Sequence, residues 1–337
     1  MSGLIELNAS ILGACSVVGY LEHGGPIGHC FDFYDDKKNG GDRFGQDTFE
    51  KAESEMQRMA LNGALDKSDM NEQRLDGIFA GDLLNQCVGS AYGLEDFDVP
   101  YFGLYGACST AVEGLMLASV MTTHGVMEHC AAVASSHNCT AERQYRTPLE
   151  YGGQRPPTAQ WTVTGAGAFI VGRAASNHAR IRAAMPGIVV DRGITDTNNM
   201  GAAMAPAALH TLVRYFKASN TAPVDYDLIA TGDLGYEGGA IFCDLARFEG
   251  YELGARYQDC GQIIYCRETQ DIHAGGSGCG CSAVVMASYL LPKLESGEIR
   301  RMLLMGTGAM MSPSSIQQGL SIPGIAHLLV LESPHIK

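Results

Sequence analysis

Residues 76–83 read DGIFAGDL, and residues 227–234 read DLIATGDL. Five of these eight positions agree at an offset of 151 residues. Downstream, GACSTAVEGLMLASVMTTHG (106–125) and GCGCSAVVMASYLLPKLESG (278–297) have equal lengths, and each begins and ends on glycine around an apolar helical pattern. Both are followed by an apolar run typical of a strand at the same offset of 172, HCAAVASS (129–136) and RMLLMGTG (301–308). The chain therefore contains one α/β unit twice.

This duplication predicts the fold class. Segments 110–121 and 282–291 are apolar nearly all round, so each helix needs cover on every side and is expected between two sheets. Two facing copies of the unit give an α/β fold with five layers, αβαβα, and two pseudo-symmetric halves. We place these halves at residues 1–175 and 176–337, because a polar connection separates two predicted strands near residue 175.

The ends of the predicted strands indicate where a ligand would bind. In open α/β sheets, ligands lie beyond the carboxyl ends of the strands. Asp82 and Asp233 follow predicted strands, while Cys108 and the glycine turn 275–281 precede the two buried helices. We therefore expect one shared pocket between the halves.

Composition excludes several classes of function. The 337 residues carry a formal net charge of −14 without a local basic patch, so no nucleic-acid partner is expected. Residues 1–19 lack a basic leading region and alternate in polarity, which favours a first strand over a signal peptide. There is no run of 18 uninterrupted apolar residues that would predict a transmembrane helix.

The cysteines point to a reducing compartment. Eleven is an odd number spread over a large chain, which favours buried, reduced thiols in the cytosol over a disulfide framework. The densest group does not have the spacing of a zinc site: Cys260, Cys266, Cys279 and Cys281. We predict no metal site and no cofactor.

Four strings carry a family resemblance: LYGACSTAVEG (104–114), RPPTAQWTVTGAGA (155–168), HAGGSGCGCSAVV (273–285) and GTGAMMSPSSIQQG (306–319). The whole chain resembles the thiolase superfamily, and these strings resemble its stage V sporulation protein AD family. The resemblance implies a thiolase-like fold and a role in moving dipicolinic acid (pyridine-2,6-dicarboxylate) into developing spores and releasing it at germination. It also implies a homodimer, made in the cytoplasm, that associates peripherally with the spore inner membrane through membrane proteins of the same operon.

Cys108 occupies the position of the acylated cysteine in thiolase-like enzymes. A cysteine at a helix N-terminus gains thiolate character from the unpaired backbone N–H groups. Condensing enzymes of the superfamily also carry two histidines, or a histidine and an asparagine. Here Asp233 stands where the ketoacyl synthase III branch has its histidine, and Gly276-Ser277-Gly278 stands where it has its asparagine. The chain is therefore predicted to be non-enzymatic, with Cys108 as part of the pocket wall.

Two alternative functions stay open at this point, besides binding without catalysis. The segment around His273 resembles the Gly-His-Pro segment of thiolases, so His273 is the remaining candidate base. The chain could then be an acyltransferase that uses Cys108 and His273. His137 is a second candidate for the pocket. A purely structural scaffold for membrane partners, with a vestigial pocket, is the third possibility.

The candidate ligand-binding residues are Asp82, Cys108, His137, Arg155, His273 and Ser277. An aspartate facing a dicarboxylate needs a proton or a cation between them, so the ligand could arrive as its calcium chelate, or Asp82 could be protonated. The guanidinium of Arg155, with those of Arg143 and Arg146, offers bidentate carboxylate recognition. The turn at Ser277 offers backbone N–H groups at a helix start. Tyr105 and Trp161 could stack on a pyridine ring.

Overall fold

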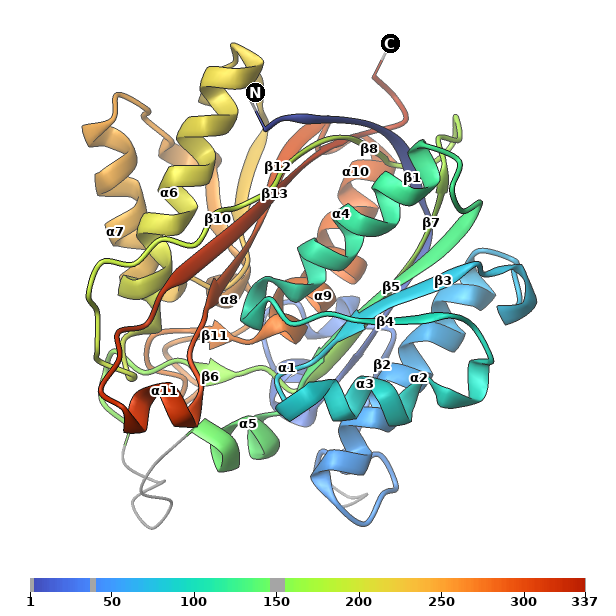
Figure 1. The fold of residues 1–337 in the computed structure, drawn as a ribbon, viewed down its shortest axis with the longest axis horizontal. Helices are drawn as coiled ribbons and strands as arrows, with labels where there is room; N and C mark the ends of the chain where they lie inside the picture. Colours follow the sequence, from blue (N-terminus) through green and yellow to red (C-terminus); the bar gives the residue numbers. More distant parts are fainter. Residues whose placement is uncertain (1–2, 37–40, 146–154, 337) are drawn as a thin grey trace.

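The computed structural model describes residues 3–36, 41–145 and 155–336. Within these residues, an eleven-stranded mixed sheet runs through the molecule in the order β10-β9-β12-β13-β8-β1-β7-β5-β3-β4, with β2 beside β1 (Figure 1). Its strands are β1 (Ile5–Val18), β2 (Phe33–Tyr34), β3 (Gly77–Gly81), β4 (Tyr101–Gly103), β5 (His129–Ser136), β7 (Gly165–Arg173), β8 (Arg180–Met185), β9 (Leu228–Thr231), β10 (Tyr257–Asp259), β12 (Arg301–Ala309) and β13 (Gly324–Glu332). A second, two-stranded sheet pairs β6 (Trp161–Thr162) with β11 (Gly276–Ser277).

The large sheet repeats one strand pattern. In the run β1-β7-β5-β3-β4 and in the run β8-β13-β12-β9-β10, the first strand of the half lies beside its last strand. The strand before the last comes next, and the remaining two strands follow in chain order. The two runs meet where β1 pairs antiparallel with β8. The predicted strands at 76–83 and 227–234 are β3 and β9, which hold equivalent places in the two runs.

Helices form the remaining layers. The outer face of the first run is covered by α2 (Phe49–Lys67), and that of the second by α6 (Met200–Ser219) with α7 (Gly235–Phe248) packed on it. Between the runs lie α4 (Thr110–Thr123) and α9 (Cys279–Val285), which contact each other and strands of both runs (Figure 1). This arrangement is the five-layer order expected from two apolar helices that need cover on every side.

The second buried helix differs from its expected form. The apolar pattern predicts one helix over 282–291, whereas the chain forms α9, a π-helical segment at Met286–Leu290, and α10 (Leu291–Ser296). Pro292 lies in the first turn of α10, directly after the π-helical segment. The π-helical segment passes the chain from the buried α9 to the more exposed α10.

Shorter helices complete the chain: α1 (Tyr20–His23), α3 (Val88–Gly93), α5 (Asn138–Tyr145), α8 (Cys260–Ile263) and α11 (Pro313–Gln317). No helix in the described part of the chain is both long and apolar enough to cross a bilayer. The boundary predicted near residue 175 falls in the connection between β7 and β8. Because β1 bonds to β8 across that boundary, a division into two separate domains stays a prediction.

Candidate functional site

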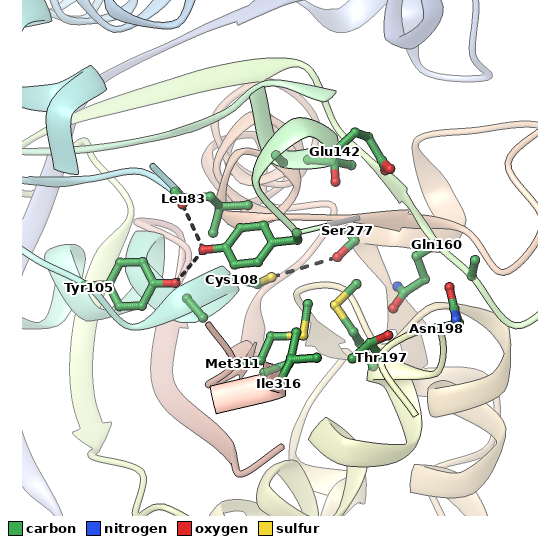
Figure 2. Close-up of a pocket in the computed structure, with 17 residues that line it drawn as sticks. Leu83, Tyr105, Cys108, Glu142, Gln160, Thr197, Asn198, Ser277, Met311 and Ile316 are labelled. Atoms are coloured by element: carbon green, nitrogen blue, oxygen red, sulfur yellow. Dashed lines mark hydrogen bonds between the residues drawn. The ribbon is translucent and has the colours of Figure 1, made fainter. Parts of the chain in front are cut away.

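A cavity of about 190 Å³ lies between the two runs of strands (Figure 2). Its walls come from both halves of the chain: Tyr105, Cys108, Tyr145 and Gln160 from the first, and Asn198, Ser277 and Met311 from the second. The cavity therefore has the shared position that the strand ends predict. Among the described residues that line it, Glu142 is charged and none is a lysine, arginine or histidine.

Cys108 is held in a tight turn at the start of α4. The turn spans Ala107–Ser109, and Ala107 has a positive φ of 50°. Thr110 fixes it, because its hydroxyl accepts a bond from Gly106 N at 3.0 Å and donates one to the Ala107 carbonyl at 2.7 Å. A methyl group at Gly308, on β12, would lie 2.5 Å from the Gly106 carbonyl oxygen, so this strand can pack against the turn only as glycine.

The surroundings of Cys108 keep its sulfur protonated. Its side chain is buried, its sulfur lies 3.8 Å from the Ser277 hydroxyl, and Asp233 is beside it. Burial raises the pKa of the Cys108 thiol well above its usual value, and the Asp233 carboxyl raises it further. A thiol in this state is a poor nucleophile, since the thiolate is the reactive form.

Asp233 is itself fully engaged. One carboxyl oxygen accepts a bond from Thr307 Oγ1 at 2.7 Å, and the other accepts from Gly278 N at 2.9 Å and Ser277 Oγ at 3.1 Å. Burial raises the pKa of Asp233, and the hydrogen bond from Thr307 opposes this rise. Asp233 and Ser277, which were predicted to stand in place of the histidine and asparagine of the condensing enzymes, thus flank the sulfur and give it neither an imidazole nor a cation.

Two tyrosines on another wall form a chain of hydroxyl groups. Tyr145 Oη donates to the Leu83 carbonyl at 2.9 Å, and it lies 2.8 Å from Tyr105 Oη. Because the one proton of Tyr145 goes to a carbonyl, Tyr105 is the donor in the bond between the two rings. Tyr105, expected as a stacking residue, therefore does line the cavity with its hydroxyl proton already donated.

Asp82 lies away from the cavity, although it occupies in the first half the place of Asp233 in the second. One carboxyl oxygen accepts from Leu84 N at 2.8 Å, and the other accepts from Ser90 N at 2.7 Å and Ser90 Oγ at 2.6 Å. Burial raises the pKa of Asp82 and that of Glu53, whose pKa rises to about 8 with Asp82 as the second cause. This carboxyl group ties the chain after β3 to the start of α3, and its ligand contact stays a prediction.

His273 and Arg155 both contact Asp271, and neither lines the cavity. His273 Nδ1 lies 2.9 Å from the Pro156 carbonyl, and its Nε2 lies 3.0 Å from Asp271 Oδ1. Arg155 forms an ion pair with Asp271 at 2.8 Å and stacks on Trp161. Neither side chain is among the cavity-lining residues. The described residues around Cys108 therefore lack the imidazole base that the acyltransferase hypothesis needs.

His137 is also held by backbone contacts. Its Nε2 lies 2.8 Å from the Asp42 carbonyl, and its Nδ1 accepts from Cys139 N at 3.1 Å. Burial lowers the pKa of His137, which favours the neutral ring that this pair of contacts requires. Arg143 pairs with Glu50 at 2.7 Å, and Arg146 lies outside the described residues. Ser277 and Cys108 are thus the predicted site residues that the structure brings together.

Gln160 is one of several cavity residues that sequence reasoning missed, with Tyr145, Asn198 and Met311. Gln160 is 6% exposed, and its Nε2 donates to the Asp233 carbonyl at 2.7 Å and the Gly276 carbonyl at 2.9 Å. The signal in the sequence is weak, because it is one polar residue inside the string RPPTAQWTVTGAGA. Within the described ranges, no three His, Cys, Asp or Glu side chains converge as they would around a metal ion.

Comparisons with known proteins agree with this architecture. OleA from Xanthomonas campestris superimposes with a TM-score of 0.60 at 16% identity, covering 97% of this chain and 99% of that one. A cerulenin-bound OleA from the same organism gives a TM-score of 0.61 at 15% identity, with 98% and 99% covered. At these identities the likeness concerns the fold alone, and it confirms the predicted thiolase-like α/β class.

The sequence comparisons reach further. Stage V sporulation protein AD of Bacillus subtilis (strain 168) is 43% identical over 319 residues, which cover 95% of this chain and 93% of that protein. The family model described as "Stage V sporulation protein AD (SpoVAD)" matches residues 2–332. With a shared fold, near-complete coverage and this identity, the chain belongs to the stage V sporulation protein AD family.

Proposed function

We propose that this protein acts in sporulation by binding dipicolinic acid without transforming it, for uptake into the developing spore and release at germination. The observation that carries the proposal is a small cavity with the buried Cys108 thiol in its wall, in a member of a family named for a stage of sporulation. An apolar cavity of about 150 Å³ admits a benzene ring. The cavity of about 190 Å³ therefore suits one substituted ring better than a long acyl chain.

The surroundings of Cys108 support binding without catalysis. Thioester chemistry needs a thiolate and a stabilised oxyanion. The buried carboxyl group of Asp233 opposes both, because it adds acceptor oxygens and negative charge beside the sulfur. No described residue that lines the cavity has an imidazole to take up a proton.

Calorimetry tests the binding step. Dipicolinate and its calcium chelate, titrated separately, are expected to bind saturably, whereas pyridine-3,5-dicarboxylate is not. Ile316 lines the cavity from α11, so Ile316→Trp should fill it and abolish binding. Gln317 is exposed on the same helix and does not line the cavity, so Gln317→Trp is the matched control that should bind normally. Absence of saturable binding to the unaltered protein would refute the proposal.

The same pair of variants separates binding from a scaffold role. If ligand binding serves sporulation, spores that carry Ile316→Trp accumulate less dipicolinate than spores that carry Gln317→Trp. A scaffold with a vestigial cavity predicts equal dipicolinate contents, provided that both variants reach the same protein level.

An acyltransferase is the rival function, and the position of the Cys108 sulfur in the cavity wall is the observation in its favour. It predicts a mass increase on Cys108 after incubation with acyl-coenzyme A or an acyl-carrier protein. Cys108→Ala would remove that adduct. Intact-protein mass spectrometry distinguishes the two functions.

We further propose a homodimer joined at β4 and peripheral attachment to membrane proteins made from the same operon. The strand β4 lies at one end of the large sheet, pairs with β3 on one side, and exposes Tyr101 and Phe102. An apolar edge of this kind is a template for pairing with another chain. Light scattering should show a dimer that Phe102→Lys disrupts, and co-purification from spore membranes tests the attachment.

A further inference from the structure

The orientation of the Gln160 amide is fixed by its two partners. Both of its hydrogen bonds go to carbonyl oxygens, those of Asp233 and Gly276, which can only accept. The group that faces them is therefore the NH₂, and both of its hydrogens are donated. Because Gln160 comes just before β6 and its partners lie in the second half, this amide also joins the two halves at the cavity.

The other end of the amide is an acceptor without a partner. Gln160 Oε1 is buried and has no hydrogen-bond partner in the described protein. The side chain lines the cavity, where Figure 2 shows it near Ser277 and Asn198. An unsatisfied buried carbonyl oxygen costs free energy unless a ligand or water supplies a donor.

The opposite wall presents acceptors as well. The Tyr105 proton goes to Tyr145 and the Tyr145 proton to Leu83, which leaves lone pairs on both hydroxyl oxygens. No cationic side chain is present among the described lining residues. A fully ionised dicarboxylate would bring four more acceptor oxygens into this space. The walls complement a ligand that carries a donor of its own.

We propose that Gln160 determines ligand specificity by accepting a hydrogen bond from the ligand, so that pyridine-2,6-dicarboxylate is held as a monoanion with one carboxyl group protonated. This inference rests on the proposed function. The proton comes from the buffer, because the free ligand is ionised at both carboxyl groups near neutral pH. The remaining carboxylate can meet the side chain of Asn198 near the N-terminus of the twenty-residue helix α6, where the helix dipole favours an anion.

Two analogues of equal charge and nearly equal shape test the role of the donor. In 6-carbamoylpyridine-2-carboxylate, one carboxyl group is replaced by an amide with permanent N–H donors. In 6-acetylpyridine-2-carboxylate, a methyl group stands in place of that NH₂. In metal-free buffer at pH 7, the carbamoyl compound should bind about tenfold or more tightly than the acetyl compound, because only it satisfies Gln160 Oε1.

Gln160→Met should bring this affinity ratio close to one, since its side chain is of similar size but has no acceptor of comparable strength. Calorimetry in two buffers of different ionisation enthalpy should show uptake of about one proton per dipicolinate bound and none per carbamoyl compound. If the variant does not fold, the ratio in the unaltered protein still decides. Equal affinities for both analogues, with dipicolinate bound saturably, would overturn the role of Gln160 alone. Failure of all three ligands to bind would overturn the proposed function.

Discussion

The Cys108 sulfur lies 3.8 Å from the Ser277 hydroxyl, and the proton of that hydroxyl is donated to Asp233. Ser277 Oγ can therefore offer the sulfur only a lone pair, and it cannot stabilise a thiolate in this arrangement. The same buried carboxyl group that orients Ser277 also repels negative charge on the sulfur. A site of this construction keeps the thiol in place while suppressing its reactivity.

Cys108 is accordingly expected to react slowly with iodoacetamide. At pH 8, peptide mass spectrometry should show it labelled at least tenfold more slowly than the half-buried Cys266, because its pKa is raised by burial and by Asp233. Asp233→Asn should speed labelling of Cys108 severalfold and leave Cys266 unchanged. Burial is the larger cause, so the variant should still react more slowly than an exposed cysteine. Faster labelling of Cys108 than of Cys266 in the unaltered protein would contradict this interpretation.

The architecture could be predicted because it is encoded in local patterns. Strands β3 and β9 are buried, so they appear as short apolar runs, and each is followed by the same Gly-Asp-Leu sequence. Repetition of these runs at constant offsets indicated a duplication without knowledge of any contact. The π-helical segment at 286–290 could not be predicted, since it depends on packing around α9 and leaves the apolar pattern unchanged.

The site was predictable only in part, because its geometry depends on contacts between distant segments. Cys108 and Ser277 were found because each precedes a buried helix at a glycine turn. Gln160 acquires its role from two carbonyl groups 73 and 116 residues away, which no spacing reveals. His273 has a positive φ of 49° and contacts Pro156 and Asp271, and this conformation directs a suggestive histidine elsewhere.

Tyr145→Phe should change how dipicolinate binding depends on pH. Without the Tyr145 hydroxyl, Tyr105 loses its acceptor and can turn its proton into the cavity, where it can donate to an ionised carboxylate. The fall in affinity between pH 6 and pH 8, about tenfold per pH unit if one proton is taken up, should become shallower in the variant. Calorimetry across this range measures it.

Tyr215→Phe provides the matched control for that change. Tyr215 and Tyr226 form a second pair of hydrogen-bonded hydroxyl groups, in the core of the other half and outside the cavity. Tyr215→Phe removes one hydrogen bond and should cost about 1 kcal/mol of folding free energy, whereas Tyr145→Phe removes two and should cost about 2 kcal/mol. If the affinity of Tyr145→Phe for dipicolinate falls with pH as steeply as that of the unaltered protein, Tyr105 does not discriminate between charge states of the ligand.

Glu22→Gln should stabilise the protein at alkaline pH. Glu22 is fully buried, one of its carboxyl oxygens has no partner, and burial raises its pKa from 4.5 to about 7. Since the folded state holds this proton more tightly than the unfolded chain, stability from this group is present below pH 4.5 and is lost as the pH rises to about 7. The amide cannot ionise, so the variant should be more stable at pH 8 by on the order of 1–3 kcal/mol.

Urea unfolding at pH 5, 6, 7 and 8 measures that effect. The difference between Glu22→Gln and the unaltered protein should shrink towards pH 5, because Glu22 is then mostly protonated in the folded state. Glu6 is exposed, so Glu6→Gln is the surface control and should change stability little. A pH-independent effect of Glu22→Gln would show that packing, rather than ionisation, governs this position.

Gly238→Ala should destabilise the outer layer formed by α6 and α7. A methyl group at Gly238 would lie 2.6 Å from Gly201 Cα and 2.8 Å from the Gly201 carbonyl oxygen, and this backbone contact cannot be relieved by a change of rotamer. The helices must separate, so we expect a loss of about 1–3 kcal/mol in urea unfolding despite the better helix propensity of alanine. At Gly114 in α4, an added methyl group would meet nothing closer than 3.2 Å. Gly114→Ala should therefore cost less than Gly238→Ala, and the reverse order would show that α6 and α7 tolerate separation.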